Sequence, residues 1–270
     1  MLRPIGGLLT FNQIFEKIVV QMVIEDMRKK LDPSQFGNQK GIGIQHYLVR
    51  LLHRIQTGLD KKTNNEVYAA ICLFIDWRQA YSRQSHTLGV QSFIKNGVRP
   101  ALIPLLISYF ENRDMRVKWH GKISKPQNLP GSGTMGSSLG NWEFLSQANQ
   151  SADCVPLQDR FKFIDDLTVL ELINLINIGI SSINVKHQIP NDIPTHNQYI
   201  DSKYLKTQSY LQQINKWSDN QQMCISEKKT KAMIINFSRN HQFTPRLNLK
   251  GQTMDIVNKI KILGTILNDK

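Results

Sequence analysis

The chain has 270 residues, of which 40% are hydrophobic and 20% are charged. This length allows one large domain or two modest ones with a real core, and the composition excludes an intrinsically disordered chain. The 34 Lys and Arg residues outnumber the 21 Asp and Glu residues, so the formal net charge is +13. A surplus of this size favours a polyanionic partner such as nucleic acid, although it also fits a basic surface without a special role.

The cysteines argue against a disulfide framework and against a zinc site. Cys72, Cys154 and Cys224 are odd in number, far apart, and form no C-x-x-C pair or cluster with the histidines. Reduced thiols fit an intracellular protein, in the nucleus or the cytoplasm. The longest apolar run, 101–110, is too short to span a bilayer and no basic amphipathic helix is evident, so no membrane partner is expected.

The first part of the chain is predicted to contain two helices and a strand. Helical spacing of apolar residues predicts helices over 12–31, ending before Pro33, and over 42–59. Segment 35–41 between them (QFGNQKG) is a loop whose glycines allow tight turns. Residues 67–75 are almost all apolar and predict a buried strand that ends at Asp76. The apolar stripes of the two helices are Ile14, Ile18, Val19, Met22, Val23 and Met27, and Ile44, Leu48, Leu51, Leu52 and Ile55.

The rest of the chain mixes helical and strand patterns. Helices are predicted around 87–96 and 101–110, then a short strand over 116–119 and a helix after the glycine-rich segment 130–140. An apolar strand at 161–164 runs into Asp165 and Asp166, and 167–170 completes a β-hairpin. A surface loop or insertion near 186–203, a helix over 204–218 and short strands at 232–237 and 260–267 follow. The mixture indicates an α+β fold.

Three aspartates stand at the ends of apolar strands. Asp76 follows one such strand, and Asp165 and Asp166 follow another. A single aspartate in this position is usually a cap or a solvated charge. Three that converged would repel one another, and a hard divalent cation such as Mg²⁺ would relieve that repulsion. The spacing alone does not establish that the two strands are neighbours.

Six motifs in order resemble the reverse transcriptase domain of non-LTR (LINE-like) retrotransposons, and together they cover nearly the whole chain. Any one of them has a high false-positive rate, but six in the same order are specific. They are R-P-I at 3–5 with F-E-K at 15–17, Q-F-G at 35–37 with K-G at 40–41, F-I-D-W-R-Q-A-Y at 74–81, F-I-D-D at 163–166, W at 217 with N at 220 and K-T-K at 229–231, and L-G at 263–264.

The resemblance implies the fingers and palm of a right-hand polymerase, the palm being an antiparallel sheet backed by helices. It implies fingers over 1–66 and a palm over 67–270, with inserted fingers elements and the loop near 186–203. The thumb is expected to be absent or rudimentary. The implied activity is that of an RNA-directed DNA polymerase, with an RNA template, a DNA primer and deoxynucleoside triphosphates as partners.

The resemblance also assigns roles to residues. Asp76, Asp165 and Asp166 would be the catalytic carboxylates, holding two Mg²⁺ ions, with Mn²⁺ as an alternative. Tyr81 would be the steric gate beneath the incoming sugar, and Gly136 would allow close approach of the backbone to nucleotide or template. The remaining candidates for contacts to nucleic acid, triphosphate or pyrophosphate are Arg3, Lys40 and Lys229, with Lys228 or Lys231 as substitutes for Lys229.

Each of these roles has a plainer alternative. Tyr81 on its own reads as a buried aromatic residue with a paired hydroxyl. Arg3 and Lys40 read as solvated surface cations, and Lys229 as part of a charged turn.

Several residues depart from the family pattern. Thr134 and Met135 stand where the family has P-Q, Gln79 replaces the usual lysine, and Ser82 replaces a common aspartate. None of these is a predicted metal ligand, but together they point to a decaying element copy. With no thumb of useful size after the L-G segment, weak or undetectable activity is expected of this chain alone.

Three other readings remain open. The chain could be a catalytically inactive, retroelement-derived nucleic-acid-binding protein. It could be another two-metal nucleotidyl transferase or nuclease without a palm. A purely structural helical protein has little support beyond the two N-terminal stripes. A palm requires the Asp76 strand to lie antiparallel beside the Asp165–Asp166 hairpin, with the carboxylates near enough to share metal ions.

Overall fold

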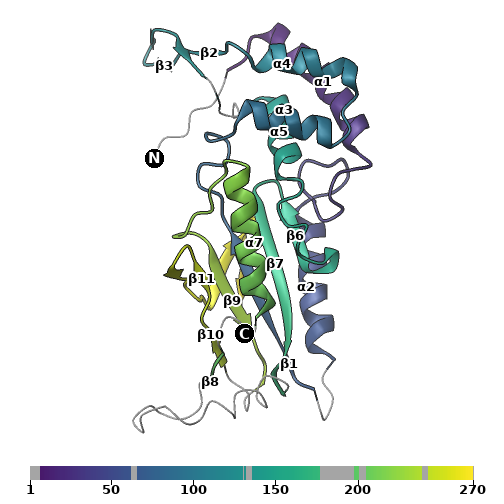
Figure 1. The fold of residues 1–270 in the computed structure, drawn as a ribbon, viewed down its shortest axis with the longest axis vertical. Coiled ribbons are helices and arrows are strands. Elements are labelled where there is room, and N and C mark those ends of the chain that lie inside the picture. Colours follow the sequence, from purple (N-terminus) through teal and green to yellow (C-terminus); the bar gives the residue numbers. More distant parts are fainter. Residues whose placement is uncertain are drawn as a thin grey trace. The chain divides into compact units, whose positions relative to one another are not determined.

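The computed structural model describes residues 7–61, 66–129, 131, 136–176, 198–200, 205–238 and 243–269 (Figure 1). The chain divides into two compact units. A helical unit comprises residues 1–32, 78–151 and 217–224, and a sheet unit comprises residues 33–77, 152–216 and 225–270.

In the described residues of the helical unit, four complete α-helices pack around one apolar core. They are α1 (Thr10–Met27), α3 (His86–Lys95), α4 (Ile103–Phe110) and α5 (Ser138–Ala148), and a 3-10 turn, Pro100–Leu102, leads into α4. All four contribute to a single buried cluster that includes Val23, Phe93, Leu106 and Leu145. Two short strand pairs, β2 (Asp114–Met115) with β5 (Gln127–Asn128) and β3 (Lys118–Trp119) with β4 (Lys122–Ile123), lie between α4 and α5 in the chain.

The buried face of α1 differs from the stripe expected from sequence. Ile14 and Ile18 are 53% and 54% exposed, whereas Glu16 is buried at 2%. The reason is a polar contact that an apolar pattern does not reveal. The Glu16 carboxylate accepts hydrogen bonds from the Ser137 hydroxyl at 2.7 Å and from the Ser138 backbone amide at 3.0 Å, at the start of α5. A carboxylate is stabilised there by the helix N-terminus, so α1 turns Glu16 inward.

The sheet unit centres on a four-stranded antiparallel sheet in the order β6-β7-β1-β9. These strands are β1 (Tyr68–Ile75), β6 (Arg160–Phe163), β7 (Asp166–Asn174) and β9 (Lys231–Ile235). β1 is central, which explains why its sequence is almost continuously apolar: seven of its eight residues are buried. The predicted hairpin is confirmed, since β6 and β7 pair directly across a two-residue turn.

Helices cover both faces of this sheet. Successive residues of a strand point to opposite faces. Cys72 and its partner Leu170 pack in the cluster that contains Tyr47 and Leu51 of α2 (Ile44–Leu59). Glu171 is the next residue of β7 and so points to the other face. Its carboxylate accepts hydrogen bonds from the first two backbone amides of α7 (Lys206–Asn220), Lys206 at 3.0 Å and Thr207 at 2.6 Å.

The inward face of α2 also differs from the predicted stripe. Leu52 is 47% exposed and Ile44 is 37% exposed, whereas Tyr47 is fully buried. Tyr47 fits because its ring meets Phe161 edge-to-face at 6.2 Å and its hydroxyl lies 2.6 Å from the Thr168 hydroxyl. A buried tyrosine is stable when its hydroxyl has such a partner.

Smaller strand pairs complete the sheet unit. The predicted strand over 260–267 is wrong in detail, because it is a hairpin of β13 (Lys259–Ile262) and β14 (Thr265–Asn268). Its turn residues, Leu263 and Gly264, have φ values of 47° and 85°, which reverses the chain. The expected loop near 186–203 lies mostly outside the described residues, but it contains β8 (Gln198–Ile200), which pairs in parallel with β10 (Phe243–Pro245). The last pair is β11 (Asn248–Leu249) with β12 (Gln252–Thr253).

These elements confirm the mixed helix and strand fold and its antiparallel sheet. Among the described residues, no helix is both long enough and apolar enough to cross a membrane. Among the described residues, Cys72, Cys154 and Cys224 form no disulfide bond.

Candidate functional site

Asp76 and Asp166 lie opposite one another at one end of the central sheet. β1 and β7 are antiparallel neighbours in which Ile75 pairs with Leu167. Extending that register by one residue places Asp76 opposite Asp166, the first residue of β7. Asp165 stands in the turn just before β7, between Phe163 of β6 and Asp166. Strand pairing therefore brings Asp76 together with Asp165 and Asp166, which lie 89 and 90 residues further along the chain.

The Asp166 carboxyl titrates far from its ordinary range. Burial, and then the negative charges of Asp165 and Asp76, raise the pKa of Asp166 from 3.8 to about 6. Both causes disfavour the ionised form, because a carboxylate loses hydration on burial and is repelled by like charges. The three side chains thus interact electrostatically, and their shared negative charge is unfavourable without a cation.

Asp76 is held by the segment that leads into β9. The Ser226 backbone amide donates to the Asp76 carbonyl at 2.8 Å, and the Asp76 amide donates to the Thr230 hydroxyl at 3.3 Å. Lys229 Nζ lies 3.5 Å from Asp76 Oδ1. The predicted basic residue of the K-T-K motif therefore lies beside the acidic residues, and the threonine between the two lysines fixes the backbone of Asp76.

Asp76, Asp166 and Lys229 line a pocket of about 160 Å³. Its other walls come from the ends of β1 and β7, from β13 and from the turn of the β13–β14 hairpin, and they include the polar side chains of Thr168 and Lys261. Leu263 of the predicted L-G motif is one of these wall residues. The pocket thus combines two carboxylates with two ammonium groups, those of Lys229 and Lys261, among apolar side chains.

Gln35 is a site residue whose role the sequence does not predict. Its side-chain Oε1 accepts hydrogen bonds from the Ile164 amide at 2.9 Å and from the Gly37 amide at 2.8 Å. The neighbouring Phe36 amide donates to the Lys162 carbonyl at 2.8 Å, so the loop lies along β6. The Q-F-G motif therefore supports the turn that carries Asp165. The sequence signal for Gln35 is the Q-F-G motif, which the resemblance identifies but to which it assigns no role.

The chemistry of the three carboxylates fits a divalent cation. Asp76 Oδ1 is buried, and among the described residues no donor makes a hydrogen bond to it, although Lys229 Nζ forms an ion pair with it at 3.5 Å. A buried carboxylate oxygen without a donor and a neighbour with a raised pKa are both features that a bound cation would relieve. However, within the described part of the chain no three Asp, Glu, His or Cys side chains are gathered tightly enough to form a metal-binding group.

The other predicted site residues belong to other parts of the chain. Tyr81 and Gly136 belong to the helical unit, where the Tyr81 ring stacks on Phe144 at 5.1 Å. Gly136 is exposed and has a φ of 102°, a conformation that favours glycine, directly before the residue that caps α5. Lys40 is exposed in the loop of the sheet unit. Arg3 lies outside the described residues.

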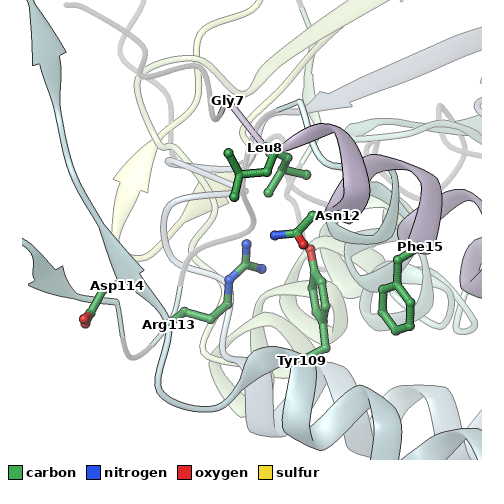
Figure 2. Close-up of a pocket in the computed structure, with 8 residues that line it drawn as sticks. Gly7, Leu8, Asn12, Phe15, Tyr109, Arg113 and Asp114 are labelled. Atoms are coloured by element: carbon green, nitrogen blue, oxygen red, sulfur yellow. The ribbon is translucent and has the colours of Figure 1, made fainter.

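The helical unit has a pocket of its own, of about 440 Å³ (Figure 2). It is lined by residues of α1 and of the segment before it, by Tyr109 of α4 and by two residues that follow α4. The Arg113 guanidinium lies 4.6 Å from the centre of the Tyr109 ring, and the Tyr109 hydroxyl donates to Glu16. Burial, and then this bond to Glu16, raise the pKa of Tyr109 to about 12.

Comparison with known proteins agrees with the motifs. The chain is 31% identical over 140 residues to the probable RNA-directed DNA polymerase from transposon X-element of Drosophila melanogaster, and 28% identical over 140 residues to that from transposon BS of the same species. Each match covers 51% of this chain and 15% of the fly protein. No family model matches the chain.

Solved structures of telomerase share the fold. The telomerase of Candida tropicalis, in complex with a fragment of telomeric RNA, matches 96% of this chain and 36% of its own, with a TM-score of 0.54 and 13% identity. The apo form matches 95% of this chain and 39% of its own, with a TM-score of 0.52 and 14% identity. The resemblance to reverse transcriptases is thus confirmed: the chain is similar in sequence, over half its length, to RNA-directed DNA polymerases of transposons, and similar in fold to telomerase.

Proposed function

We propose that this chain is the fingers and palm portion of an RNA-directed DNA polymerase from a non-LTR retrotransposon. The observation that carries the proposal is the strand register that puts Asp76 opposite Asp166, with Asp165 in the adjoining turn. The similarity to transposon polymerases gives this acidic site its chemical context. The division into fingers over 1–66 and palm over 67–270 stays a prediction.

The proposed reaction joins a deoxynucleotide to the 3′ end of a DNA primer on an RNA template. The primer 3′ oxygen forms a bond to the α-phosphorus, the bond from that phosphorus to the bridging oxygen breaks, and pyrophosphate leaves with the electron pair. The proton of the primer hydroxyl passes to solvent. Two Mg²⁺ ions, or Mn²⁺, would neutralise the charge that develops on the attacking and leaving oxygens.

The residues of the chain would bind and orient the reactants. Asp76, Asp165 and Asp166 would hold the ions, and the burial and mutual repulsion that raise the pKa of Asp166 would both favour the binding of a cation. Lys229, beside Asp76, would attract the triphosphate. In keeping with the family, Tyr81 would discriminate against a 2′-OH and Gly136 would approach the nucleotide or template.

Two basic residues are assigned to nucleic acid or triphosphate on the family pattern alone. Arg3 and Lys40 are expected to contact the template or the incoming triphosphate through charge, without reading sequence.

A specific observation also favours the inactive alternative. Lys229 already pairs with Asp76, and in the described part of the chain the acidic residues are not gathered into a metal-binding group of three. A chain in which the lysine permanently replaced the cation would bind nucleic acid through its charge of +13 without catalysing extension.

Primer extension tests the proposal directly. The full chain would be incubated with an RNA template, a labelled DNA primer, deoxynucleoside triphosphates and Mg²⁺ or Mn²⁺. We expect weak, metal-dependent extension that Asp165→Asn or Asp76→Asn abolishes, because each variant removes a proposed ligand. Asp60→Asn is the matched control, since Asp60 is exposed at the end of α2, remote in sequence from the acidic turn.

The outcomes separate the readings. Extension that persists in Asp165→Asn would overturn the site assignment. Absence of extension with salt-sensitive binding of RNA would favour the inactive alternative. Metal-dependent cleavage of nucleic acid in place of extension would favour a two-metal nuclease.

A further inference from the structure

A two-stranded ribbon extends from the helical unit between α4 and α5. Its inner pair joins Met115 to Gln127, and its outer pair joins Trp119 to Lys122. The tip is a two-residue turn in which His120 and Gly121 both have positive φ, 44° and 78°, the geometry that closes a tight hairpin. Figure 1 shows β2 and β3 reaching beyond the helices of this unit.

The ribbon is strongly basic. Residues 113–128 contain five Lys or Arg residues and one Asp, a net charge of +4. Within the described part of the chain, the four basic residues beyond Arg113 have no carboxylate within ion-pair distance. They are Arg116, Lys118, Lys122 and Lys125, and all are exposed. Unpaired cations on a projecting ribbon favour a polyanionic partner.

The two faces of the tip carry different side chains. Trp119 and Lys122 are directly opposite one another and so share one face, while Lys118 and Ile123 share the other. Trp119 is 62% exposed, whereas Trp77 and Trp142 are 6% and 5% exposed. Tryptophan is on average a highly buried residue, so the exposure of Trp119 leaves its ring available to a partner. An exposed ring beside a lysine can stack on a base while the lysine meets the adjoining phosphate.

The base of the ribbon continues this chemistry. Arg113 lies over the Tyr109 ring and lines the 440 Å³ pocket. Figure 2 shows the Asn12 side chain pointing toward Tyr109, whereas the Asp114 carboxylate points away from Arg113 and Tyr109. The ribbon's one acidic residue is therefore turned away from the cationic wall of the pocket.

We propose that the ribbon 113–128, the basic arm, binds single-stranded nucleic acid, with Trp119 stacking on a base and Lys118 and Lys122 contacting phosphates. This inference deepens the proposed function and rests on it for the choice of nucleic acid over other polyanions. The ligand is single-stranded because a base in a duplex offers no free face to Trp119. Its recognition is independent of sequence, since every base has a face on which to stack.

Binding of a fluorescein-labelled oligouridine to the full chain, followed by anisotropy over a range of salt concentrations, tests the arm. Trp119→Ala is expected to weaken binding on the order of 5- to 100-fold, while Trp119→Phe keeps most of the affinity. The variant Lys118→Gln with Lys122→Gln is expected to reduce the slope of log K against log salt by about 1.4, the loss of two phosphate contacts to a single strand. Circular dichroism would establish that each variant is folded.

Lys206→Gln with Lys216→Gln is the matched control. It removes the same two charges from exposed positions on α7 and should leave the arm intact. If both double variants weakened oligouridine binding equally, the proposed role of the basic arm would be wrong, because only the net charge of the chain would then matter. Unchanged binding by Trp119→Ala, a preference for duplex RNA, or binding to phosphatidylserine vesicles in place of oligouridine would also overturn it.

This test is separable from that of the polymerase. Asp165→Asn should bind oligouridine as the wild type does. Loss of extension without loss of binding would concern the acidic site alone. Oligouridine affinity that is unchanged in the arm variants would contradict the proposed role of the basic arm, even if the chain extends primers.

Discussion

The side-chain oxygen of Gln35 accepts a hydrogen bond from the backbone amide of Ile164 at 2.9 Å, so the Q-F-G loop supports the acidic turn from outside the sheet. Ile164 has a φ of 57°. A β-branched residue in this conformation is strained by about 1–2 kcal/mol, and it persists only where neighbours fix it. Gly37 shares the task, because a Cβ at that position would lie 2.6 Å from the Ile164 nitrogen.

Gln35→Leu should loosen the acidic turn. The change removes the acceptor of two backbone amides and leaves them without a partner, which costs about 1–3 kcal/mol of unfolding free energy. Urea denaturation measures this loss, and hydrogen exchange should show reduced protection at the Ile164 amide. Gln56→Leu on the exposed side of α2 is the control. Unchanged protection of Ile164 in Gln35→Leu would contradict the support role.

The raised pKa of Asp166 makes stability depend on pH. Its pKa of about 6 in the folded chain exceeds the ordinary 3.8, so the folded state binds the proton more tightly. The protonated group stabilises the fold fully below about pH 4, and this contribution is lost as the pH rises through 6. Allowing for partial solvent exposure, about 1 kcal/mol is lost by pH 8.

The effect of Asp166→Asn on the unfolding free energy of the metal-free chain should therefore depend on pH. The substitution should be more favourable at pH 8 than at pH 4, by about 1 kcal/mol. Urea denaturation in the presence of EDTA at the two pH values measures the difference. Asp60→Asn, at an exposed position, serves for comparison. An effect of Asp166→Asn that is the same at both pH values would show that the Asp166 carboxyl is not strained by its neighbours.

Divalent cations should relieve the repulsion among the carboxylates of Asp76, Asp165 and Asp166. A ligand that binds only the folded chain raises its stability, by about 2.7 kcal/mol at a concentration 100 times the dissociation constant. We expect Mg²⁺ or Mn²⁺ to raise the thermal midpoint of the wild type, and to raise that of Asp76→Asn less. Li⁺ or Na⁺ at equal ionic strength controls for screening. An equal rise in both proteins would place the bound cation away from Asp76.

The strands that carry the aspartates are the part of the site that sequence predicts well. Residues 69–75 are buried on both faces of the sheet, and such a segment is apolar whatever its neighbours are. Segment 161–164 is apolar except for Lys162. Their pairing is not visible in the pattern, because the register depends on contacts across 90 residues of chain. Only the order of the motifs suggested that Asp76 and Asp166 would meet.

The burial of polar residues in the core cannot be predicted from the hydrophobic pattern of the sequence. Glu16 and Tyr47 interrupt the apolar stripes of α1 and α2, and each is buried because its polar atoms have hydrogen-bond partners there. Without knowledge of these partners, hydrophobic spacing predicts that each helix buries its more apolar residues. The β13–β14 hairpin was missed for a similar reason, since its turn depends on Leu263 adopting a positive φ that leucine rarely takes.

Glu16→Gln tests the inward turn of α1. The Glu16 carboxylate accepts hydrogen bonds from Ser137, Ser138 and Tyr109, next to the loop that contains Gly136. An amide keeps the shape but loses the charge that the N-terminus of α5 favours and one acceptor oxygen, so unfolding should become easier by about 1–3 kcal/mol. Glu25→Gln on the exposed side of α1 should change stability little. Equal effects of the two changes would mean that Glu16 is not a helix cap.

Tyr81 has both a structural and a functional reading, and two substitutions separate them. Its ring stacks on the fully buried Phe144 at 5.1 Å, so Tyr81→Val should destabilise the helical unit by about 1–3 kcal/mol under either reading. If Tyr81 is the steric gate, Tyr81→Val should also admit ribonucleotides about tenfold more readily, which corresponds to about 1.4 kcal/mol of discrimination. Tyr81→Phe keeps the ring and should keep the discrimination. Primer extension with ribonucleoside and deoxyribonucleoside triphosphates measures this ratio. A loss of stability with an unchanged ratio would assign Tyr81 to the core alone.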